Sequence, residues 1–155
     1  MTKQTSTMTK QKKLIRNTVT GFLSLILIGL LTAVISCSHD EERYDVTHKV
    51  IYKAQVSAGS NITSVQYNIP TRHLEPVMNV NGTTWTSPEV AGTEKLAVGE
   101  VKNMGAIVLV KATGANASST LKLQIYVDGV LKKEEVFTGQ DLTNDIQYDI
   151  EYKVN

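Results

Sequence analysis

The chain has a single cysteine and only three histidines among its 155 residues, which limits the chemistry available to it. One cysteine cannot form an intramolecular disulfide, and a free thiol would be a liability in an oxidising compartment unless it were chemically committed. His48 and His73 have no cysteine or carboxylate at metal-ligand spacing, and no nucleophile motif accompanies them. We therefore expect both to be structural histidines with satisfied partners, and we predict no metal ion, no cofactor and no enzymatic activity.

Basic residues are scarce beyond the first 37 positions. That segment carries five of the 16 Lys and Arg and none of the 15 Asp and Glu, so the rest of the chain has 11 basic against 15 acidic residues. Binding to nucleic acid requires a basic face that neutralises phosphates and releases counterions. The mildly acidic remainder therefore excludes nucleic acid as a partner.

The first 36 residues have the three parts of a secretory signal: basic residues up to Arg16, an apolar run over Val19–Ile35, and a small-residue junction. The residues at the junction are Val34, Ile35, Ser36 and Cys37. They resemble a lipobox, which implies a diacylglyceryl thioether on Cys37 and cleavage in front of it. The sequence therefore predicts a lipoprotein signal peptide over residues 1–36. An uncleaved membrane helix is less favoured, because the 17-residue run is short and contains Thr, Gly and Ser.

Residues 37–45 are predicted to form an acidic tether between the lipid and a folded domain. The candidate sorting residues are Ser38, Asp40, Glu41 and Glu42, and His39 lies among them. Serine directly after the cysteine resembles lipoproteins sent to the outer membrane of Gram-negative bacteria, and the acidic run resembles a tether signal for the outer face. The alternative is a solvated linker, because clustered like charges repel and resist packing.

From Val46 onward, apolar residues alternate with polar ones, which predicts half-buried β-strands and no helix. The faces expected to be buried comprise every second residue of Val46–Val56, Thr63–Ile69 and Ile146–Val154. Pro70 ends the second strand, since proline cannot donate to a sheet ladder. Ala106–Val110 is apolar throughout, which predicts a central strand that is either covered on both faces or lies under a loop.

Two turn sequences, Asn81-Gly82 and Asp128-Gly129, favour the positive φ angles of a type I′ turn, so each predicts an antiparallel hairpin. About seven short strands at this spacing indicate an all-β fold, an antiparallel immunoglobulin-like β-sandwich over residues 46–155. Trp85 is expected in its core. Calcium binding by Asp141, Asn144 and Asp145 is a conceivable alternative to a solvated acidic loop.

Three segments resemble the MmpS family of small, membrane-anchored transport accessory proteins. They are Tyr52–Tyr67, the Trp85-Thr-Ser segment, and Leu123–Glu134 with Ile125, Val127, Asp128 and Gly129 in its hairpin. The resemblance implies an immunoglobulin-like sandwich and a role beside an efflux or lipid-transport machine. Typical members also have a pair of cysteines near the end of the domain and a transmembrane anchor, whereas this chain lacks the cysteines and is predicted to be anchored by lipid.

These features together predict a lipid-anchored, non-catalytic envelope protein, a binding or interaction module at the outer membrane and exposed either to the periplasm or at the surface. Its partners would be the membrane, through the lipid, and an envelope protein, a glycan or a transporter. The alternatives are an MmpS-like accessory subunit, a hydrolase of envelope polymers and a pilus subunit.

Overall fold

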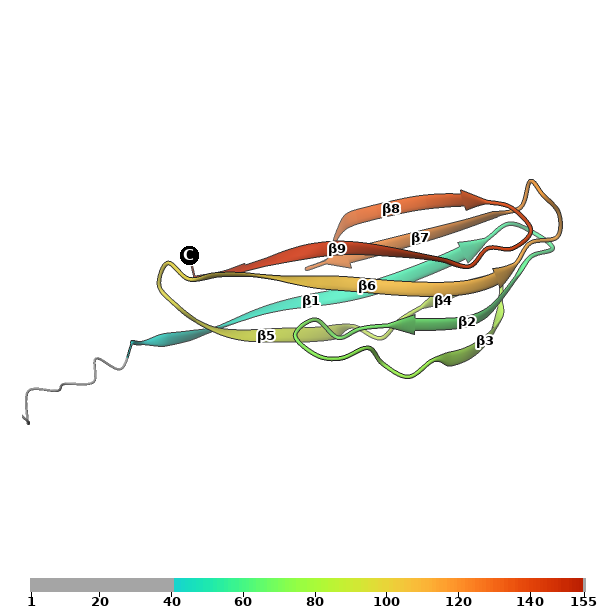
Figure 1. Cartoon of the computed structure of the whole chain (residues 1–155). Coiled ribbons are helices and arrows are strands. Elements are labelled where there is room, and N and C mark those ends of the chain that lie inside the picture. Colours follow the sequence, from blue (N-terminus) through green and yellow to red (C-terminus); the bar gives the residue numbers. More distant parts are fainter. Residues whose placement is uncertain (1–40, 155) are drawn as a thin grey trace, which may run out of the picture. The chain divides into compact units, whose positions relative to one another are not determined.

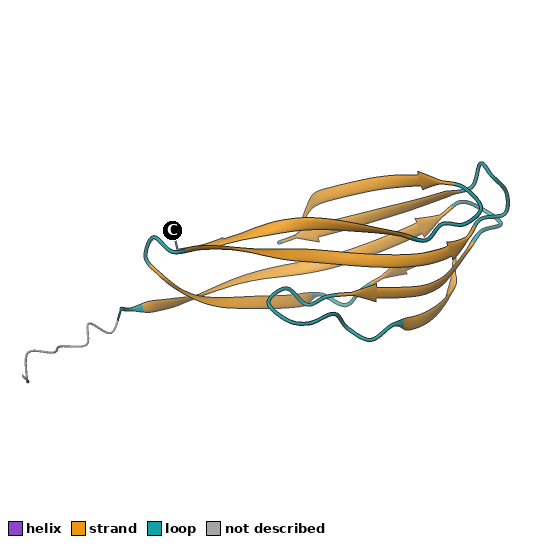
Figure 2. Cartoon of the chain, in the orientation of Figure 1, coloured by secondary structure: helices purple, strands orange, loops and turns teal. Residues whose placement is uncertain are grey.

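This computed structural model describes residues 41–154 of the chain. These residues form nine β-strands and no helix (Figure 2). The strands are β1 (Arg43–Val56), β2 (Asn61–Tyr67), β3 (Met78–Gly82), β4 (Thr84–Thr86), β5 (Val90–Ala97), β6 (Val101–Thr113), β7 (Thr120–Val127), β8 (Val130–Thr138) and β9 (Asn144–Lys153). Residues 41–154 contain no helix of the length and apolar character needed to cross a membrane. The predicted signal peptide and residues 37–40 lie outside the described residues.

The strands form two antiparallel sheets (Figure 1). Sheet A has the order β4-β1-β7-β8, with β5 also paired to β1, and sheet B has the order β3-β2-β6-β9. The prediction of an all-β, antiparallel sandwich is therefore confirmed, with nine strands in place of about seven. Two of the nine, β4 and β5, follow each other along the same edge of β1. Pro88 lies between them and separates them, because proline has no N–H to donate to the ladder.

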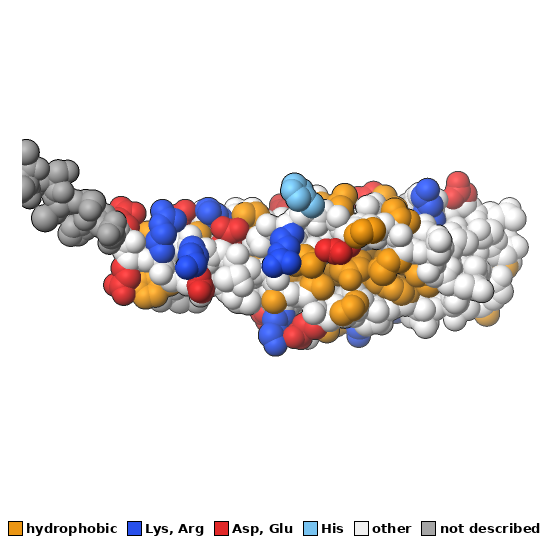
Figure 3. Space-filling model, turned by 90° about the horizontal axis from the view of Figure 1, so that it is seen from below, with side chains coloured by type: hydrophobic (Ala, Val, Ile, Leu, Met, Phe, Trp, Pro, Cys, Tyr) orange, Lys and Arg blue, Asp and Glu red, His pale blue; other side chains and the backbone are white. Residues whose placement is uncertain are grey.

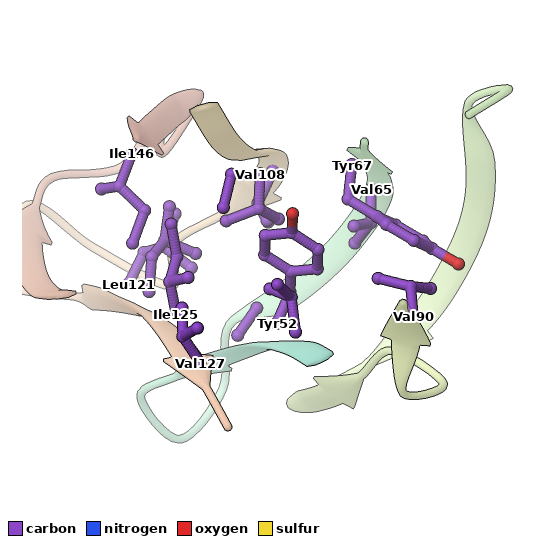
Figure 4. Close-up of a cluster of buried hydrophobic side chains, with 14 of the residues drawn as sticks. Tyr52, Val65, Tyr67, Val90, Val108, Leu121, Ile125, Val127 and Ile146 are labelled. Atoms are coloured by element: carbon purple, nitrogen blue, oxygen red, sulfur yellow. The ribbon is translucent and has the colours of Figure 1, made fainter. Parts of the chain in front are cut away.

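The core lies between the sheets and is formed by alternate residues of each strand. On β1 the buried residues include Val50, Tyr52 and Ala54, and the residues between them face outward. Figure 4 shows Tyr52 and Ile125 from sheet A with Val65 and Val108 from sheet B in one cluster of buried side chains. The period of two predicted from the sequence is thus the period of burial.

Strand β1 begins at Arg43, so the last three residues of the predicted tether are strand residues that pair with β5. Strand β6 lies between β2 and β9, which confirms the central position predicted for Ala106–Val110. Trp85 is half-buried and packs against Tyr67, with 5.6 Å between the ring centroids. It therefore lies at the border of the core.

The second strand departs from its predicted pattern at a β-bulge between Ile62 and Ser64. A bulge inserts one extra residue, so the alternation of faces shifts. Ile62 is consequently buried and Thr63 is exposed, where its hydroxyl donates to the carbonyl of Lys111 at 3.0 Å. The prediction that Thr63 shares the buried face of Val65 was wrong for this reason.

The two predicted hairpins have different outcomes. Asp128 and Gly129 have φ angles of 52° and 79° and join β7 directly to β8, which confirms the second hairpin. The first prediction was wrong: β3 pairs with β2 in sheet B, whereas β4 pairs with β1 in sheet A. The Gly82 N–H donates to Asn61 Oδ1 at 2.8 Å, so pairing with β2 replaces the tight turn.

Candidate binding groove

A groove of about 790 Å³ lies on the outer face of sheet B, beside the loop that joins β2 to β3. Its lining comprises Asn68 and Thr71–Glu75 from the loop, Met104, Gly105 and Ile107 from β6, and Gln147 from β9. Three segments that are far apart in the sequence therefore meet in one concave surface. Concave sites with a few fixed polar groups are the usual places where proteins bind ligands.

The groove is backed by Asn68, a buried polar residue whose side-chain nitrogen and oxygen both form hydrogen bonds. Asn68 Nδ2 donates to the Gly105 carbonyl at 2.6 Å, and the N–H of Ile107 donates to Asn68 Oδ1 at 2.8 Å. The Tyr52 hydroxyl lies 2.8 Å from Asn68 Oδ1 and 2.9 Å from the Asn68 carbonyl oxygen. Burial raises the pKa of Tyr52, so its hydroxyl stays protonated and remains a donor. These bonds fix the start of the loop.

The loop has a strained residue, Thr71, whose φ is 72°. A β-branched residue rarely adopts positive φ, so this conformation is maintained by its surroundings. The N–H of Arg72 donates to the Ile69 carbonyl at 2.9 Å, and the N–H of Glu75 donates to the Tyr67 carbonyl at 2.8 Å. Local strain of this kind concentrates at ligand-contacting positions, which supports a functional assignment for the loop.

The chemistry of the groove combines an apolar floor with polar side chains at its edge. Ile107 is half-buried in the floor, Met104 also lines the groove but packs against the core, and Arg72 and His73 are exposed on the loop. Gly105 leaves space beside Gln147 in the floor. A Cβ at position 105 would fill that space, since it would lie 3.0 Å from the side-chain nitrogen of Gln147. The groove thus presents hydrogen-bond donors around an apolar surface.

The residues singled out from the sequence lie elsewhere. Glu41 and Glu42 are exposed ahead of β1, whereas Val34, Ile35, Ser36, Cys37, Ser38 and Asp40 lie outside the described residues. Sequence reasoning missed the groove, since its residues share no local pattern. The sequence had two local signals near the groove. Pro70 indicated the end of a strand, and Gly105 marked a position without a side chain beside the apolar segment Ala106–Val110.

The two histidines of the domain differ in role. His48 Nδ1 lies 2.7 Å from Asp128 Oδ2, and its ring packs edge-on against Tyr152 with centroids 4.8 Å apart. His48 therefore has the structural role predicted for it, linking β1 to the β7–β8 hairpin and to β9. His73 is instead exposed on the groove's loop, contrary to that prediction.

The acidic loop before β9 has local hydrogen bonding. Asp141 Oδ1 accepts from the Thr143 hydroxyl at 3.0 Å. Within residues 41–154, no group of three or more His, Cys, Asp or Glu side chains is placed to hold a metal ion. The described part of the chain thus gives the calcium alternative no support.

Comparisons with known proteins do not assign the chain to a family. No protein-family model matches it, and no curated protein matches it. The groove must therefore be interpreted from its own chemistry.

Asn68→Ala is expected to destabilise the domain by about 2–4 kcal/mol, because it leaves the partly buried Ile107 N–H and Gly105 carbonyl and the buried Tyr52 hydroxyl without their side-chain partner. Urea unfolding followed by far-UV circular dichroism measures the change. Asn103→Ala on the exposed side of β6 is the matched control and should change stability by less than about 0.5 kcal/mol. Equal effects of the two substitutions would contradict a structural role for Asn68.

Proposed function

We propose that this protein is a non-catalytic binding module that lipid on Cys37 holds in the cell envelope, at the outer membrane, and that it binds its partner through the groove. The lipobox-like residues Val34 to Ser36 support the anchor. Cys37 stands only six residues before Arg43, where the first strand of the domain begins. A short tether of this kind keeps the domain next to the membrane that carries the lipid.

The single observation that carries the binding role is the construction of the groove. The backbone of a strained loop is fixed beside the outer face of sheet B by the Asn68 network, and the exposed side chains of Arg72 and His73 offer donors beside an apolar floor. The Glu75 side chain also lines the groove. A loop whose backbone is fixed in advance loses little entropy on binding. The favoured partner is therefore an envelope glycan or protein segment that is rich in hydrogen-bond acceptors.

A photo-crosslinking residue at Leu74 tests this role in intact cells. Leu74 is exposed and lines the groove, so we expect a discrete crosslinked product from this site. Arg72→Ala should reduce the product about tenfold or more, because a hydrogen bond from a charged donor contributes about 1.5–3 kcal/mol. The matched control carries the photo-crosslinker at Val130, which is equally exposed but lies in the β7–β8 hairpin. Similar products from both sites, or no response to Arg72→Ala, would contradict the groove's role.

The resemblance to the MmpS family favours a second candidate, an accessory subunit of an efflux or lipid-transport system. The hairpin that carries this resemblance is fixed to β1, since Asp128 Oδ1 accepts the N–H of Lys49 at 2.9 Å. A rigid hairpin suits a docking contact with a larger protein. This candidate requires the lipidated protein to elute with a polytopic transporter in mild detergent, whereas the leading proposal does not.

A further inference from the structure

The end of the domain at which β1 begins carries an exposed group of apolar side chains, here named the apolar tip: Tyr44, Val98 and Val101. They are 41%, 75% and 51% exposed. Val98 lies in the β5–β6 turn, which is closed by the N–H of Glu100 on the Ala97 carbonyl at 3.1 Å. Gly99 follows with φ of +86°, so the turn directs Val98 away from the core.

Two members of the apolar tip, Tyr44 and Val98, lie together in space. Tyr44 is paired with Leu96 across β1 and β5, and Tyr44 and Val98 line one hollow of about 270 Å³ with Ala97 and the exposed Glu41 and Glu42. Val101 is the first residue of β6, directly after the β5–β6 turn. Figure 1 shows the β5–β6 turn at the same end of the domain as the start of β1. Large exposed apolar groups that cluster in this way mark an interaction surface.

The charged side chains beside the apolar tip form ion pairs with one another. Arg43 Nη1 lies 3.4 Å from Glu100 Oε2, and Lys102 Nζ lies 2.9 Å from Glu94 Oε2. Figure 3 shows side chains of both signs at this end of the domain. The exposed carboxylates of Glu41 and Glu42, which lie beside Tyr44 and Val98, form no ion pair with a residue of the described part of the chain. The basic side chains at this end are thus neutralised, and apolar contact is the attraction that remains for a surface partner.

We propose that the apolar tip inserts into the lipid surface to which Cys37 is attached. This inference rests on the proposed lipidation. Cys37 is six residues from Arg43, where β1 begins, and an extended chain spans at most about 3.6 Å per residue, so the tether reaches no more than about 22 Å. Apolar faces at a membrane interface are buried about 5–10 Å deep, and tyrosine favours that depth. The tether therefore keeps Tyr44 and Val98 within reach of the interface.

Insertion of this end orients the rest of the domain. Strand β1 starts at the apolar tip and has 14 residues, which span about 46 Å at about 3.3 Å per residue. The loop over residues 114–119 lies at the opposite end of the domain (Figure 1) and would point away from the membrane. The groove lies on a face between the two ends and would stay accessible to a partner.

The charges beside the apolar tip also predict the kind of lipid, because the exposed Glu41 and Glu42 disfavour anionic headgroups. Since Arg43 and Lys102 are engaged by Glu100 and Glu94, attraction to anionic headgroups contributes little. Insertion should therefore take place on zwitterionic phosphatidylcholine vesicles and change little between low and high salt.

The test uses the full, lipidated protein in phosphatidylcholine vesicles, with an environment-sensitive fluorophore at Val98→Cys. The thioether on Cys37 leaves the new thiol as the single labelling site. Nitroxide lipids should quench this label about twofold or more, because insertion places it within the headgroup region. The same label at Ala117→Cys, exposed in the 114–119 loop, should remain unquenched.

A label-free measurement separates the outcomes. Hydrogen exchange of the 97–101 amides should slow several-fold on vesicles, and Val98→Asp should abolish the effect. One contradicting outcome is that the 97–101 amides of Cys37→Ser protein without vesicles are protected as strongly as those of the wild type on vesicles. That result would mean that a second copy covers the apolar tip, and it would overturn the inference. If mass spectrometry confirms acylation while the Val98 label stays as solvent-exposed as the Ala117 label, insertion is wrong and the proposed anchor stands. If acylation is absent, the proposed anchor itself fails.

Discussion

Replacing Cys37 with serine is expected to move the protein from the membrane fraction to the soluble fraction. The anchor depends on acyl chains attached to the sulfur, and each buried methylene contributes about 0.8 kcal/mol. One chain gives only reversible binding, but two or three make release negligible. The serine hydroxyl would carry none of them, so we expect nearly all of the protein to be released. Fractionation of cells followed by alkaline extraction of the membranes measures the distribution.

Ser36→Ala is the matched control, because alanine retains a small residue in front of the cysteine. This variant should remain in the membrane like the wild type. An uncleaved membrane helix predicts another result, since its apolar run at Val19–Ile35 is unchanged by the Cys37→Ser substitution. Retention of Cys37→Ser protein after alkaline extraction would therefore favour the helix and contradict lipidation.

Gly92→Ala is expected to destabilise the domain by about 3 kcal/mol, because the added methyl group has no space. A Cβ at this position would lie 2.6 Å from the Pro70 carbonyl oxygen and 2.7 Å from the Tyr152 hydroxyl. Both neighbours are buried, and the Pro70 carbonyl belongs to the backbone, so neither can turn away easily. Urea unfolding should show a fall in the midpoint of about 1–2 M.

Gly82→Ala serves as the control, since its Cβ would meet only the Thr84 carbonyl oxygen, at an ordinary 3.8 Å. We expect a change below about 1 kcal/mol for this variant. Tyr152→Phe tests the cause in more detail, because the Tyr152 hydroxyl is buried without a hydrogen-bond partner in the described structure. Combined with Gly92→Ala, it should recover part of the lost stability. No recovery would assign the strain to Pro70 alone.

The sequence was a good guide where structure depends on neighbouring residues. Burial along β1 and β9 follows the alternation seen in Val46–Val56 and Ile146–Val154, because each strand has one face toward the core. The Asp128-Gly129 turn was equally predictable, since positive φ at two successive residues is a local requirement.

Features that depend on distant residues were not predictable in this way. Asn81-Gly82 has the same turn chemistry, yet Gly82 pairs with Ile62, so β3, which ends there, belongs to sheet B. The next strand, β4, pairs with β1 in sheet A. The groove also requires tertiary contacts, because Asn68 acquires its role only when β6 brings Gly105 beside it. Local propensity describes the separate segments and cannot describe the surface that they form together.

The most direct test of the central claim is mass spectrometry of the amino-terminal peptide from the protein in its native host. We expect a peptide that begins at Cys37 and carries the mass of a diacylglyceryl thioether with a further acyl group on its amino terminus. A peptide that still contains residues 1–36, or an unmodified thiol at Cys37, would contradict lipid anchoring and the membrane orientation inferred from it.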